Sequence, residues 1–212
     1  MKNNNNSHLI PADTDSKDVL TELVDIAKND KAEYVSRKEA LDNISDNAVI
    51  NDIAETAKDD WIRLEAAIKC RNNKVLNEFA KNHHDERIKL EAALELKTEF
   101  ILCEIAKSGK DEFIQEIALK NIADKELLEN IVLNSNNEKI KVDAAIILND
   151  MEIVKNLAGD LKSDSLKFKL GCYMNDYEIL GNLAKNSKDD DIQINAENWI
   201  KTFITAEDTS FD

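Results

Sequence analysis

The chain of 212 residues is strongly acidic and almost free of helix breakers. Its 28 Lys and Arg against 43 Asp and Glu give a formal net charge of −15, which argues against general binding to nucleic acid or to anionic lipid, because both need a basic surface. Hydrophobic residues make up 42% of the chain, while only 4 Gly and 1 Pro are present, so we expect a folded, all-α protein without glycine-rich phosphate loops.

The two ends of the chain differ in composition from the middle. Residues 1–17 form a polar leader that we expect to be disordered, and residues 205–212 form an acidic tail that we expect to be flexible. No apolar run is long enough for a signal peptide or a membrane span, and the three cysteines have no Cys-x-x-Cys spacing. These features predict a cytoplasmic protein without a disulfide framework.

A repeat of about 26 residues fills the middle of the chain, residues 18–204. One small apolar residue recurs in each unit and serves as its anchor: Ala27, Ala54, Ala80, Ala106, Val132, Ala158 and Ala184. The first interval between anchors is 27 residues and the other five are 26. Repeats at a fixed period of this length are typical of stacked helical arrays, so we expect about seven repeats in a single domain.

Apolar spacing predicts two helices in each repeat, which we call helix A and helix B. Helix A has apolar residues four and one positions before the anchor, and helix B has them eight, twelve and sixteen positions after it. The expected first core positions of helix B are Val35, Ile62, Ile88, Ile114, Ile140, Leu166 and Ile192. Capping side chains precede helix B at Asp59, Asp85, Asp111, Asn137, Ser163 and Asp189, and helix A at Asn72, Thr98, Asp124, Asp150 and Asp176.

The pattern of helix B resembles a known family. Asp59, Ile62, Arg63 and Ala66 follow the spacing of the second helix of HEAT repeats, and the short unit is similar to the compact HEAT-like repeats of bacterial and archaeal proteins, including phycobilin lyases. This resemblance implies a right-handed α-solenoid whose concave side is lined by helix B. We call equivalent positions in successive repeats a column. The column that usually carries arginine in the family departs from the family pattern: it reads Ser36, Arg63, Lys89, Gln115, Lys141, Lys167 and Gln193. In addition, no turn carries the proline that is frequent in the family.

The first and last repeats predict polar ends. Where the middle repeats have a small residue in helix B, the first has Glu39, and the last has Glu197 one position later. A carboxylate buried between stacked helices is costly, so these residues favour solvated ends and a monomer. In the sixth repeat, Gly159 and Gly171 predict a bend or a looser segment, and Gly171 also permits a close approach of backbones.

Two columns of helix B supply the candidate partner-binding residues. One column carries Tyr34, Trp61, Arg87 and Phe113, and the next cationic column carries Arg63, Lys89 and Lys141. Aromatic and cationic side chains are typical of binding surfaces. Both columns also have a structural interpretation: the rings pack on the neighbouring repeat, and the cations bond within their own repeat or the next one.

Metal and catalytic sites find little support. The His83-His84-Asp85-Glu86 cluster has adjacent histidines rather than a pair four residues apart, and no second cluster exists, so we expect no metal and no cofactor. Cys70 and Cys172 fall in apolar columns, whereas Cys103 falls in a mostly polar column and is expected to be exposed. No histidine lies near these thiols in the sequence, and we expect no enzymatic activity.

The sequence therefore favours a non-catalytic scaffold for a protein partner of basic or mixed charge, bound on the concave surface of helix B. One alternative is an enzyme of the chromophore-lyase kind. The other is an acidic protein that mimics DNA, which would need carboxylates along one face. Glu65, Glu91 and Asp143 share a column, but lysines interrupt it.

Overall fold

A computed structural model describes the backbone of residues 17–208 and the side chains of residues 17–202. This part of the chain is entirely helical, with fourteen α-helices and no strand. The predicted leader lies outside the described residues up to position 16. The predicted tail begins at residue 205. Within it, the last helix continues to Asp208, and residues 209–212 lie outside the part of the chain that the structure describes. The helices are α1 (Lys17–Lys28), α2 (Tyr34–Asp42), α3 (Asn47–Thr56), α4 (Asp60–Cys70), α5 (Asn73–Asn82), α6 (Glu86–Glu95), α7 (Glu99–Ser108), α8 (Glu112–Lys120), α9 (Lys125–Asn134), α10 (Glu138–Leu148), α11 (Met151–Asp160), α12 (Asp164–Met174), α13 (Tyr177–Asn186) and α14 (Asp190–Asp208).

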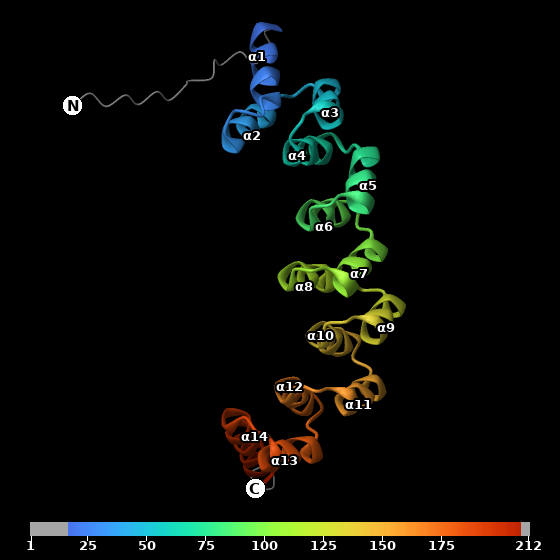
Figure 1. The fold of residues 1–212 in the computed structure, drawn as a ribbon, viewed down its shortest axis with the longest axis vertical. Coiled ribbons are helices and arrows are strands. Elements are labelled where there is room, and N and C mark those ends of the chain that lie inside the picture. The colour runs from blue at the N-terminus through green and yellow to red at the C-terminus, as the bar shows by residue number, and fades with distance from the viewer. Residues whose placement is uncertain (1–16, 209–212) are drawn as a thin grey trace, which may run out of the picture. The chain divides into compact units, whose positions relative to one another are not determined.

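Successive helices pack as pairs, each odd-numbered helix against the even-numbered helix that follows it (Figure 1). Most of them have 9 to 12 residues, too few for a stable isolated helix, so their stability comes from burying one face on neighbours. This arrangement confirms the all-α class and is consistent with a helical repeat.

The described helices divide into two compact units, one ending at Thr98 and the other beginning at Glu99. In the first unit α2 packs on α4 and α4 on α6, around a core that includes Ile53 and Leu76. In the second unit α7 packs on α9, α10 on α12 and α12 on α14, around a core that includes Leu102 and Ile131. Within this second unit α8, α10 and α12 lie along one side and α7, α9 and α11 along the other (Figure 1).

Carboxylate and hydroxyl caps begin most helices as the sequence predicts. The Asp59 side chain accepts a hydrogen bond from the Ile62 N–H at 3.0 Å, and Asp124 accepts from the Glu126 N–H at 2.9 Å. Thr98 is the exception, because its hydroxyl is buried and has no hydrogen-bond partner. The preceding Lys97 has a left-handed backbone with φ of 52°. The uncapped position coincides with the boundary between the two units.

The register of α2 differs from the prediction by one residue. Val35, the expected core residue, is 64% exposed, whereas Ala40, Leu41 and Ile44 are buried. The helix α2 begins seven positions after the anchor Ala27, whereas the later even-numbered helices begin six positions after theirs, and this extra residue accounts for the first interval of 27. Arg37, not Ser36, therefore belongs to the cationic column, and it is buried beside Asp59 with an ion pair of 3.0 Å.

The same shift corrects the interpretation of Glu39. Ala40 occupies the small-residue position of α2, and Glu39 faces solvent. Glu39 is therefore not a polar replacement in the first repeat, and that prediction was wrong. At the other end, Glu197 of α14 is exposed.

None of the helices in the described range is both long and apolar enough to cross a membrane.

Candidate interaction surface

The cationic column of the even-numbered helices is largely engaged inside the molecule. The Arg63 Nε–H donates to the carbonyl of Ala54 at 3.1 Å, and the Gln115 amide donates to the equivalent carbonyl of Ala106 at 3.1 Å. Lys141 Nζ lies 3.5 Å from the carbonyl of Leu133. These side chains satisfy carbonyls at the ends of the odd-numbered helices, which have no partner within their own helix.

Arg63 has two further contacts in the first unit. Its guanidinium pairs with Asp60 at 3.1 Å, and it lies 4.8 Å from the centre of the Phe79 ring, within the range of a cation–π interaction. Arg63 was predicted to bind a partner, but it joins α4 to α3 and to α5. Its contacts therefore agree with the alternative interpretation, in which the cations bond within their own repeat or the next one.

Tyr34 is also held by neighbours. Its hydroxyl donates to Glu65 Oε1 at 3.0 Å, and the Lys38 ammonium donates to Glu65 Oε2 at 2.8 Å. Burial and the nearby Glu65 carboxylate raise the pKa of Tyr34, and the hydrogen bond to Glu65 raises the pKa of Lys38. Because of the register shift, Tyr34 stands at the position of Asp60 and not at that of Trp61.

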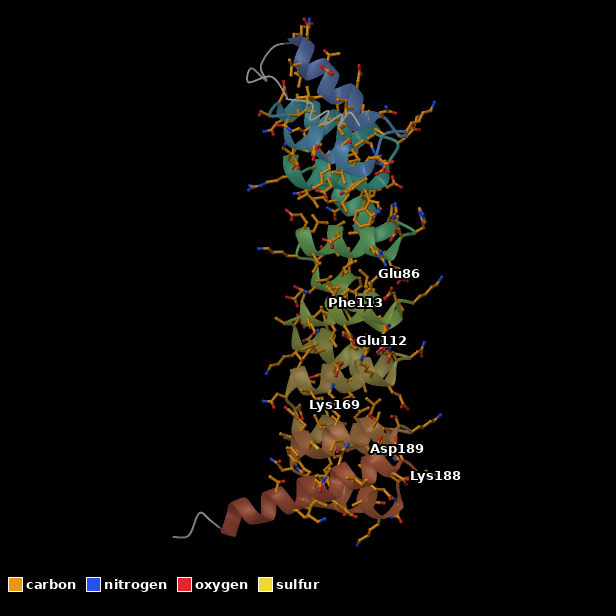
Figure 2. All side chains as sticks on the ribbon, turned by 90° about the vertical axis from the view of Figure 1, so that its left-hand side faces the viewer. Glu86, Glu112, Phe113, Lys169, Lys188 and Asp189 are labelled. Atoms are coloured by element: carbon orange, nitrogen blue, oxygen red, sulfur yellow. The ribbon has the colours of Figure 1, made fainter. Side chains whose placement is uncertain are left out.

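The remaining candidates are more accessible. Trp61 and Lys89 are half-buried, on α4 and α6, and Arg87 is exposed on α6. Phe113, the second residue of α8, is 70% exposed and lies beside Glu112 on the side formed by the even-numbered helices (Figure 2). The sequence thus found one large, exposed aromatic side chain on this side of the second unit.

Charged residues flank Phe113 along α8. Lys139 of α10 pairs with Glu112 at 2.6 Å and with Glu116 at 2.5 Å. These carboxylates raise the pKa of Lys139, and Lys139 lowers the pKa of Glu116. Further along the same side Lys169 pairs with Asp143. Positive charges here are matched by carboxylates, so the surface is mixed in sign and is not a cationic ladder.

The predicted residues fall into two sets. The first unit holds Tyr34, Trp61, Arg63, Arg87 and Lys89, and the second holds Phe113 and Lys141. Arg37 was missed, although the interval of 27 residues was the available signal for its register.

His83 has a structural role that explains the histidine cluster. Its Nε2 lies 3.0 Å from Asp60 Oδ2, and its Nδ1 accepts a hydrogen bond from the Asp85 N–H at 3.0 Å. Ser187 makes the same two contacts in the second unit: its hydroxyl donates to Asp164 Oδ2 at 2.8 Å and accepts from the Asp189 N–H at 3.2 Å. The imidazole thus links two helix pairs, as a serine does elsewhere. Across the described residues, no group of three His, Cys, Asp or Glu is placed to hold a metal ion.

The Asp60 carboxylate is the acceptor of this link. Its partial burial alone would raise its pKa, but hydrogen bonds from His83 and Arg63 outweigh this effect, and the pKa of Asp60 is lowered. Asp60 is therefore an acceptor that favours its charged form and not a general acid.

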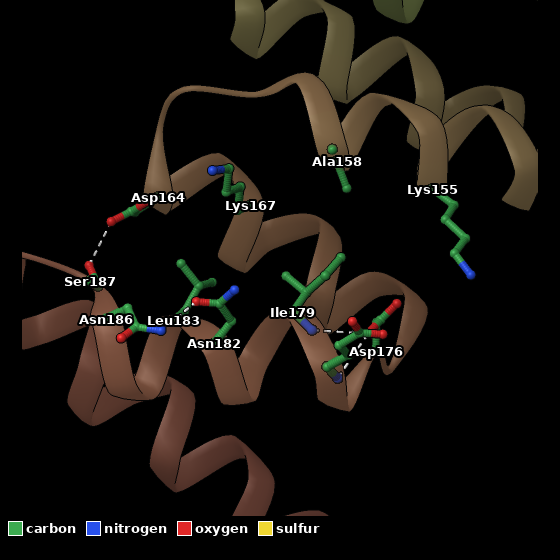
Figure 3. A pocket seen from close by; sticks show the side chains of 12 residues that line it. Lys155, Ala158, Asp164, Lys167, Asp176, Ile179, Asn182, Leu183, Asn186 and Ser187 are labelled. Carbon is green, nitrogen blue, oxygen red and sulfur yellow. Dashed lines mark hydrogen bonds between the residues drawn. The ribbon is translucent and has the colours of Figure 1, made fainter.

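An open cleft of about 370 Å³ lies between α11, α12 and α13 (Figure 3). Gly159 opens this space, because a Cβ added there would meet nothing within 4 Å. Its walls combine Lys155 and Lys167 with Glu178 and with two carboxylates already engaged in hydrogen bonds, Asp164 and Asp176. Such a mixture does not select a single small-ligand charge.

The cysteines are free, and the prediction for Cys103 was wrong. Cys103 is buried, with Sγ 3.6 Å from the carbonyl of Leu127, and burial raises the pKa of its thiol. Cys70 and Cys172 are half-buried, and burial also raises the pKa of Cys172. Raised thiol pKa values disfavour the thiolate that nucleophilic chemistry requires.

No protein-family model, no curated protein and no solved structure matches the chain.

Proposed function

We propose that the chain is a cytoplasmic, monomeric scaffold of seven HEAT-like repeats, wound as a right-handed α-solenoid, which binds a protein partner on the surface of its even-numbered helices. The partner carries basic or mixed charge, and the chain acts without a cofactor and without catalysis. The resemblance of helix B to HEAT repeats and the packing of successive helix pairs support this architecture.

The exposed ring of Phe113 carries the functional part of the proposal. A phenylalanine that is 70% exposed gains little from folding, and on α8 it stands between Glu112 and Glu116 in the sequence, both of which pair with Lys139. An aromatic side chain with a charged rim is the usual centre of a protein interface.

A matched pair of variants tests the proposal. Phe113 and Phe100 are each the second residue of a helix and are 70% and 66% exposed, but Phe100 lies on an odd-numbered helix, α7. The full chain, Phe113→Glu and Phe100→Glu are used for crosslinking capture from nuclease-treated lysate, at low and at high salt, and their thermal unfolding is compared.

We expect a stoichiometric protein partner that is lost with Phe113→Glu and retained with Phe100→Glu, while both variants unfold at similar temperatures. Loss of the partner in both variants, or in neither, contradicts binding on the even-numbered helices. Capture of DNA-binding proteins alone, insensitive to Phe113→Glu, supports the DNA mimic instead.

The mimic has one observation in its favour. Acids begin six successive even-numbered helices: Asp60, Glu86, Glu112, Glu138, Asp164 and Asp190. However, Asp60 and Asp164 accept hydrogen bonds from the next helix pair, and Glu138 accepts from the Lys162 N–H at 3.3 Å. Acids at helix N-termini also interact favourably with the helix dipole. These hydrogen bonds and the helix dipole explain why acids begin these helices without a role in mimicking DNA. The scaffold therefore remains the better proposal.

A further inference from the structure

Two turns of the second unit share a five-residue motif. The turn before α11 reads Asn-Asp-Met-Glu-Ile from Asn149, and the turn before α13 reads Asn-Asp-Tyr-Glu-Ile from Asn175. Only the middle residue differs, and it is large and apolar in both. The equivalent first residues of the other odd-numbered helices are polar: Lys17, Asn47, Asn73, Glu99 and Lys125.

The two turns have the same conformation. Asn149 and Asn175 are left-handed, with φ of 56° and 53°. In the first turn the Asp150 side chain accepts from the N–H groups of Glu152 and Ile153 at 3.0 and 3.2 Å. In the second, Asp176 accepts from Glu178 and Ile179 at 3.0 Å each. Since the backbones match, both turns present their apolar residue and their glutamate in the same way.

The side chains so presented face solvent. Met151 is 52% exposed and Tyr177 is 42% exposed, and Glu152 and Glu178 that follow them are exposed as well. The glutamates have a local reason to be there, because acids near a helix N-terminus are stabilising. Methionine and tyrosine at a first helical position gain nothing from the dipole or from capping.

The apolar surface extends onto the ends of the even-numbered helices. Ile147 of α10 is 44% exposed, and Tyr173 holds the corresponding position of α12. The Tyr173 hydroxyl donates to the Asn149 side chain and lies 3.5 Å from the carbonyl of Ile146, so its ring lies across the first turn. In α4 of the first unit the same position is Lys69, whose ammonium donates to the carbonyl of Leu41 at 2.7 Å. A tyrosine here replaces a charge with an apolar ring.

We propose that these two turns form one docking surface for a basic amphipathic segment of another protein. The tandem-turn surface consists of Ile147, Met151, Glu152, Tyr173, Tyr177 and Glu178. Two apolar side chains are each followed by an exposed carboxylate, of which Glu178 shares its cleft with Lys155 and Lys167. This pattern matches a segment with two large apolar residues and with Lys or Arg beside them. The inference rests on the proposed function of protein binding, but it uses another side of the second unit than Phe113.

The test pans a displayed library of random 14-residue peptides against the full chain and measures the affinity of the recovered peptides. The variants are Glu178→Lys, the double change Met151→Ser with Tyr177→Ser, and the matched control Glu126→Lys. Glu126 is the exposed second residue of α9 and carries the same charge, but it follows Lys125 instead of an apolar residue. Thermal unfolding verifies that each variant folds.

We expect peptides with a net positive charge and at least two large apolar residues. Their affinity falls about tenfold or more with Glu178→Lys and with the double serine change, and about twofold or less with Glu126→Lys. Recovery of no peptides or of acidic peptides overturns the proposal, as does an equal loss with Glu126→Lys. Phe113→Glu separates the two surfaces: peptides that depend on Phe113 and not on the turns overturn the tandem-turn surface and leave the proposed function standing.

Discussion

The contacts of Asp60 show how one carboxylate can connect two helix pairs of the first unit. Asp60 is the first residue of α4, and its carboxylate accepts hydrogen bonds from His83, just after α5, and from Arg63 of its own helix. Both partners favour the charged carboxylate. Asp190 begins α14 at the same position and shares the favourable location at a helix N-terminus.

Replacement of Asp60 should make stability depend less on pH. Because the pKa of Asp60 is lowered by folding, its contribution is present above the ordinary aspartate value of about 3.9 and is lost as pH falls through the lowered value. We expect Asp60→Asn to reduce the free energy of unfolding at about pH 7, and the difference from the wild type to narrow towards about pH 3. Urea titration at both pH values measures this. A difference of equal size at both values, or the same behaviour in Asp190→Asn, would contradict the role of the link.

Residue chemistry alone could not assign His83. A histidine beside a histidine, an aspartate and a glutamate has the composition of a metal site, and only the turn geometry aims its two ring nitrogens at Asp60 and at a backbone N–H. The signal that was available is Ser187, which occupies the same position in its repeat.

The caps and most helix positions were predictable because they depend on local rules. An aspartate before an apolar run places a helix start, and Asp59, Asp85 and Asp111 all cap as predicted. The register of α2 was not predictable in this way. The repeats were aligned on the anchor residue of helix A, and the extra residue between this anchor and α2 shifts every side chain of α2 by one position. Cys103 was mispredicted for a related reason: the equivalent residues of most other repeats are polar, but here the thiol packs against α9.

The register of α2 gives an element-scale prediction. Arg37 is buried with its guanidinium on Asp59, whereas Ser36 is exposed. We expect Arg37→Ala to lower the free energy of unfolding by about 2 kcal/mol, because it leaves the Asp59 carboxylate without its cation, and Ser36→Ala to change it by less than about 0.5 kcal/mol. Urea unfolding followed by circular dichroism distinguishes them. The reverse order would restore the register expected from the anchors.

Two helical glycines should respond to alanine in opposite directions. A Cβ at Gly159 of α11 would meet nothing within 4 Å, so Gly159→Ala should stabilise the fold by about 0.5–1 kcal/mol. At Gly171 of α12 it would lie 3.0 Å from Leu180 Cδ2, in a fully buried side chain, so Gly171→Ala should destabilise by about 1–2 kcal/mol. The same urea titration measures both. Stabilisation by Gly171→Ala would show that α12 and α13 are less closely packed.

The charge of the whole molecule makes its stability sensitive to salt. With 43 acidic and 28 basic residues, like-charge repulsion opposes the folded state, and exposed ion pairs contribute little. Raising the salt from about 0.01 M to about 0.15 M shortens the Debye length from about 30 Å to about 8 Å. We expect the thermal midpoint to rise over this range, in scanning calorimetry with sodium chloride. A fall would mean that the ion pairs outweigh the repulsion.

At this scale the sequence predicted the all-α class, because the period and the scarcity of helix breakers leave few alternatives. It did not predict the division after Thr98. In the sequence, Thr98 is a capping residue like those of the other repeats. That its hydroxyl is buried without a hydrogen-bond partner is seen only in the structure.

The link between helix pairs has a consequence for how such a chain can lengthen. In each unit one helix pair is joined to the next through the carboxylate that begins its even-numbered helix: Asp60 in the first unit and Asp164 in the second. Asp190 places the same group at the start of α14, the last helix of the described residues. Tandem duplication of a 26-residue segment in the gene would therefore supply a new pair together with the acceptor that receives it. Growth of the protein by whole units would therefore carry its own connection between successive pairs.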